Sequence, residues 1–165
     1  TRLDGMPKPT ATLTLYDDPA VRDRYQAAVK AADHAEEALA ALPKDVHPSA
    51  LALVQAQGYQ AHAELQAATD ERDLHTETLT FQALEREQLA ELLLKHPPTE
   101  EDEEAGRDYH FDTFAPEVIS AASMDGMPVE YAAKALKKWS LGDADDLWNV
   151  AWSVQRRKRT DLGKG

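Results

Sequence analysis

The chain has 165 residues, a formal net charge of −12 and no cysteine. The length is typical of one domain, and the lack of cysteine excludes disulfides, thiolate catalysis and cysteine-ligated metals. The negative charge repels a phosphate backbone, so we expect no nucleic-acid partner. No apolar run reaches the roughly 18 residues that span a bilayer, and no basic-then-apolar signal opens the chain. We therefore expect no membrane partner and a soluble protein of the cytoplasm.

The first regular element predicted is a short strand. Residues 10–15 alternate small polar and apolar side chains, which is typical of a half-buried strand. Asp18 and Pro19 follow, an aspartate suited to cap a helix and a proline suited to its first position. The sequence therefore predicts that a helix begins at residue 19.

Residues 19–73 carry two stretches with apolar or small residues at alternating spacings of three and four. Two prolines, Pro43 and Pro48, bracket a polar turn between the stretches. Such spacing forms the seam between two packed helices, so we predict an antiparallel, alanine-rich helical hairpin. The first seam is Val21, Tyr25, Ala28, Ala32, Ala35, Leu39 and Leu42, and the second is Leu51, Val54, Gly58, Ala61, Leu65 and Ala68.

A second strand is predicted over residues 76–81, with the same polar-apolar alternation as residues 10–15. Pairing the two strands would close the base of the hairpin. It would also bury one face made of Leu13, Leu15, Leu79 and Phe81. Two strands alone are marginal in water, so helices or strands of a neighbouring copy must cover them. We thus expect a single domain over 1–165, in which 1–18 and 74–165 form an α+β body and 19–73 form a helical arm.

The next segment is expected to be a helix followed by an acidic linker. Residues 85–94 have acids in the first turn, and His96-Pro97-Pro98 ends the helix. An acidic run then fills much of residues 97–108. Such runs are typical of a solvated linker, and the alternative is a docking site for a basic partner.

Three short helices are predicted in the remainder, which completes a mainly α (α+β) fold with a C-terminal helical bundle. The first begins near Thr113 with Pro116 in its first turn, the second opens at Pro128, and Asp143 is placed to cap the third. Trp148 and Trp152 lie one turn apart on the third helix. They suit either core packing or a partner interface.

No constellation of residues predicts catalysis, a cofactor or a metal. None of the six histidines has another at a spacing of three or four, although His34 and His62 can face each other across the hairpin. Gly-rich phosphate loops and nucleophile elbows are also lacking. The basic run at 156–159 suits either an acidic or nucleic-acid partner or the dipole at a helix C-terminus. We expect a protein that is not an enzyme.

Three short motifs follow one another in the second half of the chain. They are Leu92-Leu93-Leu94-Lys95-His96-Pro97-Pro98, then Tyr109-His110-Phe111-Asp112-Thr113-Phe114-Ala115-Pro116, then Leu147-Trp148-Asn149-Val150-Ala151-Trp152. With the strand pair and the alanine-rich insertion, this order resembles the tail assembly chaperones of long-tailed (siphovirus-type) bacteriophages that infect actinobacteria. The resemblance covers residues 10–157.

The resemblance implies a non-enzymatic chaperone in the cytoplasm of a bacterial host. Members of that family are thought to coat the helical tape measure protein, deliver it to tail tube subunits and stay out of the mature virion. We expect a homo-oligomer, with partner contacts at Phe111, Phe114, Trp148 and Trp152. Either the hairpin or the C-terminal helices would supply the main binding surface. The alternative is a structural tail or connector subunit that multimerises and remains in the particle.

Overall fold

The computed structural model describes residues 1–158. This part is 65% helical, with seven helices and a two-stranded antiparallel sheet, which confirms the predicted α+β class. The chain divides into two compact units. The arm is residues Thr14–Glu77, and the body is Thr1–Leu13 with the chain from Thr78 onward. The unit boundaries thus lie inside the two strands, a few residues from the predicted limits of the hairpin.

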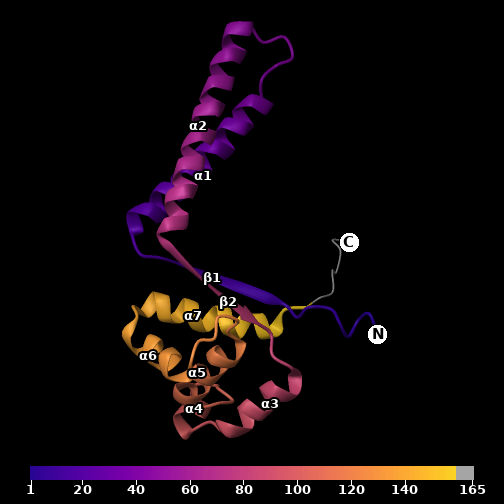
Figure 1. Cartoon of the computed structure of the whole chain (residues 1–165), viewed down its shortest axis with the longest axis vertical. Coiled ribbons are helices and arrows are strands. Elements are labelled where there is room, and N and C mark those ends of the chain that lie inside the picture. The colour runs from indigo at the N-terminus through magenta and orange to yellow at the C-terminus, as the bar shows by residue number, and fades with distance from the viewer. Residues whose placement is uncertain (159–165) are drawn as a thin grey trace. The chain divides into compact units, whose positions relative to one another are not determined.

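Two long helices, α1 (Pro19–Ala40) and α2 (Pro48–Leu74), run side by side in the arm (Figure 1). The Asp18 side chain caps α1 by accepting from the backbone N–H of Ala20, and His47 caps α2 through Ser49. Prolines at the first helical positions fix both starts. Each predicted seam residue is buried or half-buried except Leu39, which is 44% exposed. The heptad pattern therefore predicted the hairpin and its inner face.

Polar contacts between α1 and α2 supplement the small-residue seam. Arg24 on α1 pairs with Glu64 and Glu71 on α2, which raises the pKa of Arg24 and lowers the pKa of the Glu64 carboxyl. His62 Nε2 lies 3.1 Å from Glu36 Oε1, so its partner across the seam is a carboxylate and not His34. These contacts are largely exposed to solvent, so each adds little stability.

Strands β1 (Thr10–Tyr16) and β2 (Thr76–Gln82) pair as predicted. In the body, Phe81 is fully buried, and Leu13 and Leu79 pack against the same core. Leu15 is half-buried too, but it belongs to the arm, where it lines a hollow with Leu74, and it is not part of the body's core. The two-residue alternation continues to Leu15, but the core ends before it.

The backbone of β2 is also bonded by the loop that follows α5. The Thr80 carbonyl accepts from the Met124 N–H at 2.8 Å, and the Thr80 N–H donates to Asp125 Oδ2 at 2.7 Å. An antiparallel bridge joins Phe81 to Ser123. The body thus supplies the cover that an isolated strand pair needs.

Helices make up most of the body, and they bury most of its large apolar side chains. The elements are α3 (Arg86–Lys95), α4 (Glu100–Glu104), α5 (Phe111–Ala122), α6 (Val129–Lys138), α7 (Leu141–Ser153) and the 3-10 turn η1 (Val154–Arg156). The largest fully buried side chains of the described chain are Phe81, Phe114, Ile119, Leu147, Val118 and Val154. No helix in residues 1–158 is both long and apolar enough to cross a bilayer.

Two predicted helix starts differ from those observed. Helix α5 begins at Phe111, so Pro116 lies in its second turn and is buried there. Because proline has no N–H, one turn of the helix lacks its usual hydrogen bond. Helix α7 is capped by Ser140, whose hydroxyl accepts from the Asp143 N–H at 3.2 Å. Asp143 is therefore a first-turn residue and not the cap.

The acidic stretch within residues 97–108 is not simply a solvated linker. It contains α4, which opens with a reciprocal capping box between Thr99 and Asp102. Asp102 is only 6% exposed, while the other acids of α4 are exposed. Gly106 follows α4 with φ of 74°, a left-handed conformation that glycine adopts without strain. One acid of the run therefore anchors a short helix, and the glycine redirects the chain.

Candidate partner-binding site

An aromatic cluster joins the second and third motifs of the body. We use the name for the rings of Tyr109, Phe111, Phe114, Trp148 and Trp152. The Trp148 and Trp152 rings stack at 5.2 Å with an interplanar angle of 13°, as expected for residues one turn apart on α7. Tyr109 lies 4.5 Å from the Phe114 ring and 5.6 Å from the Trp152 ring. The Phe111 ring meets Trp148 edge-on at 5.4 Å and 87°. Helices α5 and α7 therefore pack through aromatic faces and edges.

The four residues expected to contact a partner are brought together in this cluster, but they differ in burial. Phe114 is 0% exposed, so its ring supports the other rings and offers no surface to a partner. Phe111, Trp148 and Trp152 are half-buried, and each keeps part of its ring at the surface. The cluster thus combines core packing with an exposed aromatic face.

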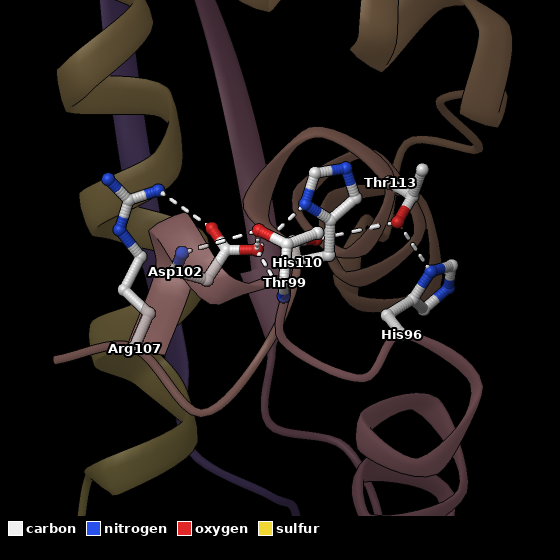
Figure 2. A network of polar contacts seen from close by, with 6 residues as sticks. All are labelled: His96, Thr99, Asp102, Arg107, His110 and Thr113. Atoms are coloured by element: carbon white, nitrogen blue, oxygen red, sulfur yellow. Dashed lines mark hydrogen bonds and ion pairs between the residues drawn. The ribbon is translucent and has the colours of Figure 1, made fainter. Parts of the chain in front are cut away.

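A polar network lies beside the cluster, with Asp102 at its centre (Figure 2). Asp102 Oδ2 accepts from the Thr99 N–H at 2.9 Å and from the Thr99 hydroxyl at 2.8 Å, and it lies 2.8 Å from His110 Nδ1. Arg107 Nη1 lies 3.5 Å from Asp102 Oδ1. The backbone N–H of Thr99, with help from His110 and the Thr99 hydroxyl, lowers the pKa of Asp102 to about 2. Asp102 is therefore ionised at neutral pH.

His96, the histidine of the His-Pro-Pro motif, forms the second part of the network. Its Nδ1 lies 2.8 Å from the Thr113 hydroxyl, and its Nε2 lies 2.9 Å from Glu117 Oε2 (Figure 2 shows the Thr113 contact). The His96 carbonyl also accepts from the His110 N–H at 3.0 Å. The end of α3 is thereby fastened to the first two turns of α5.

The network joins the chain around Asp102 to the start of α5. A buried aspartate that holds a histidine through Nδ1 is the orienting half of an acid–base pair. The hollow beside it is lined by Thr99, Glu101, Asp102, Arg107, His110, Phe111 and Asp112. The Thr99 hydroxyl in this hollow already donates to the Asp102 carboxylate. Within residues 1–158, no group of three or more His, Cys, Asp or Glu is arranged to hold a metal.

An open groove borders the aromatic cluster and has a volume of about 400 Å³. It is lined by Leu89, Leu93, Gly106, Arg107, Asp108, Tyr109, Trp152, Gln155 and Arg156. The Arg156 guanidinium lies 5.7 Å from the centre of the Trp152 ring. Burial raises the pKa of the Tyr109 hydroxyl at the groove wall. The groove is therefore lined by apolar and aromatic side chains together with polar ones, among them two arginines and one aspartate.

The arginines of the basic run at 156–159 differ in their surroundings. Arg156 lies at the groove, whereas Arg157 donates to the Thr10 carbonyl at 2.7 Å and holds β1. Arg159 lies outside the described residues. Helix α7 ends at Ser153 and leads directly into η1, whose last residue is Arg156, so the basic run begins in the last helical turn and Arg157 follows it. The groove at Arg156 brings together residues 89–93, 106–109 and 152–156, a proximity that the linear sequence does not reveal.

Sequence reasoning missed the residues of the polar network. One signal was present, because Thr99 and Asp102 have the spacing of a capping box. The contacts of His96 with Thr113 and Glu117 join residues 17 and 21 positions apart, and no helical or strand spacing predicts such pairs.

Comparison with known proteins finds no matching family model, no matching curated protein and no matching solved structure.

Proposed function

We propose that the protein is a non-enzymatic tail assembly chaperone of a long-tailed bacteriophage. It binds helical segments of the tape measure protein in the host cytoplasm, helps recruit tail tube subunits and is absent from the mature virion. A tape measure protein is a long helical chain whose apolar stripes aggregate when bare. A chaperone for it needs apolar surface for those stripes and net charge to keep the complex in solution.

One observation carries the proposal: the three motifs of the resemblance, far apart in the sequence, meet at one place in the body. His96 of the first motif bonds Thr113 of the second. Phe114 of the second motif packs 5.6 Å from the Trp152 ring of the third. A chance likeness among three short motifs gives no reason for them to share one cluster. Their meeting supports the view that they form one structural unit.

The arm supports an oligomeric chaperone by a separate route. Its outer surface exposes large apolar side chains, among them Leu53 and Tyr59, although the buried residues of its inner seam are mostly small. Tyr59 also lines a hollow of about 200 Å³ with Leu39, Val54 and Gly58. Exposed apolar groups on a stiff hairpin favour contact with further helices, either of a second copy or of the partner.

Co-expression with the tape measure protein of the same phage, a large helical protein, tests the proposal. We expect the large protein to become soluble and to co-purify with this chain, in a complex larger than one copy of each. A variant in which residues 18–74 are replaced by a short turn tests the arm. If the body folds but the complex is lost, the arm supplies the oligomer or partner contacts. Failure of the intact pair to co-purify would contradict the proposal.

Mass spectrometry of purified particles separates this proposal from the alternative of a structural tail or connector subunit. A chaperone should be missing from particles that contain the tube and tape measure proteins. Its presence at a fixed ratio to the tube subunit would assign it to the virion.

A further inference from the structure

The groove beside the aromatic cluster differs in charge from the chain as a whole. The protein has a formal net charge of −12, yet the ionised groups that line the groove are Arg107, Arg156 and Asp108. Arg107 already faces Asp102. Arg156 forms no ion pair within the described chain, and its guanidinium rests on the Trp152 ring. One cation thus lies at the groove without a carboxylate partner among residues 1–158.

The groove walls also have a helical spacing. Leu89 and Leu93 lie one turn apart on α3, and both are half-buried. Trp152 and Arg156 are also four residues apart, at the end of α7 and in η1. Each wall therefore presents a pair of side chains about one helical turn apart. A row of side chains spaced at i and i+4 on a partner helix has the same repeat.

We propose that this groove docks one acidic amphipathic helix of a partner protein. Large apolar side chains of that helix enter between Leu89, Leu93 and Trp152, and an aspartate or glutamate one turn away pairs with Arg156. A volume of about 400 Å³ suits two or three large side chains, which is the number that a short helical motif inserts. An acidic segment with these properties would otherwise be repelled by this chain, so the local cation selects the binding place.

This inference deepens the proposed function by naming the chemistry of the bound segment, but its test does not use a tape measure protein. A random 15-residue peptide library is selected on the intact wild-type protein. We expect enrichment of peptides with large apolar residues at i and i+4 and an acid one turn away. Failure of the library test and failure of co-purification are therefore separate results.

Binding of the best selected peptide is then measured on three variants by fluorescence anisotropy. Arg156→Glu should weaken binding about tenfold or more, because an attraction becomes a repulsion. Leu93→Ser should weaken binding of all selected peptides, since it removes apolar surface from the groove. Lys138→Glu is the matched control, because it makes the same charge change at an exposed position on α6 that does not line the groove. The affinity of this variant for the peptide should equal that of the wild type once the effect of net charge is subtracted.

Three results would overturn the proposal. The first is a library selection that enriches no binding peptide. The second is a selection that enriches apolar peptides without acidic residues. The third is equal binding to Arg156→Glu and Lys138→Glu. Sedimentation of the wild type without peptide gives a further result: self-association that Arg156→Glu abolishes would assign the groove to a second copy. Circular dichroism of each variant confirms that a loss of binding is not a loss of fold.

Discussion

The body and the arm are stabilised by different kinds of side chain. The body buries Phe81, Phe114, Ile119 and Leu147 completely, whereas the fully buried seam of the arm consists of Val21 and small residues. The arm joins two helices that are neighbours in sequence, and the body joins β1 to elements more than sixty residues later. Local contacts form the arm, and large side chains brought together over long separations specify the body. We therefore expect the two regions to respond separately to substitutions.

Tryptophan fluorescence can report on the body alone. All three tryptophans, Trp139, Trp148 and Trp152, lie in the body, while helical circular dichroism reports on both regions. A change seen by circular dichroism but not by fluorescence can therefore be assigned to the arm. This pair of probes makes the comparison testable at each step below.

The largest effect is expected for Phe114→Ala in the body. The ring is fully buried and packs against Tyr109, Trp148 and Trp152, so its removal leaves a cavity. We expect a loss of about 3–5 kcal/mol in the free energy of unfolding, which can unfold a marginal domain. Chemical denaturation followed by tryptophan fluorescence measures it. Phe114→Leu is the control, since it keeps most of the volume and should cost much less. An equal loss in both variants would mean that the ring packing is not responsible.

The second-largest loss in the free energy of unfolding is expected for Ala68→Leu in the arm. Ala68 is 1% exposed in the seam between α1 and α2, so a larger side chain forces the helices apart. Overpacking of this kind costs about 1–3 kcal/mol. We expect helical circular dichroism to show an earlier unfolding step while the fluorescence transition stays in place. Ala67→Leu, on the exposed side of α2, is the matched control. A parallel shift of both probes would show that the two regions unfold together.

The difference between the arm and the body also explains which of their features could be predicted from the sequence. The arm could be predicted almost residue by residue, because its seam has a regular spacing and prolines mark its turn. The body could be predicted as elements, but its network could not, because His96, Asp102, His110 and Glu117 meet only after folding. The role of Asp102 was hidden by its neighbours: four similar acids surround it in α4, and burial distinguishes only one of them. A single-sequence pattern gives no measure of burial within such a run.

Acid should weaken the body through Asp102. The pKa of this carboxyl falls from 3.8 to about 2 on folding, because the protein donors bond its ionised form. Its contribution to stability is therefore complete above about pH 4 and is lost as the pH falls toward 2. We expect the fluorescence-detected melting temperature of the wild type to decrease over this range, and less so for Asp102→Asn. An equal slope in both proteins would show that Asp102 is not the group that titrates.

The capping box gives a test of the same network at neutral pH. Thr99→Ala removes the hydroxyl that accepts from the Asp102 N–H and donates to the Asp102 carboxylate. Loss of such a cap costs about 1 kcal/mol. Thr99→Ser keeps the hydroxyl and should restore most of the stability. If the alanine and serine variants melted together, the methyl group and not the cap would explain the loss. Fluorescence is again the probe, since the change lies in the body.

The smallest effect is a stabilisation, and it is expected in the arm. Gly58 lies inside α2, and a Cβ added there would meet no atom within 4 Å. Packing within one copy therefore does not require glycine, although glycine lowers helix stability by about 0.5–1 kcal/mol relative to alanine. Gly58→Ala should raise the free energy of unfolding of the arm by this amount and leave tryptophan fluorescence unchanged.

Gly58 also lines the arm hollow with Leu39 and Tyr59. Gly58→Leu therefore fills the hollow and blocks close approach of another helix. If Gly58→Leu stays folded but loses co-purification or self-association, while Gly58→Ala keeps both, the glycine serves an intermolecular contact. If both variants assemble normally, the hollow is only an imperfection of the seam.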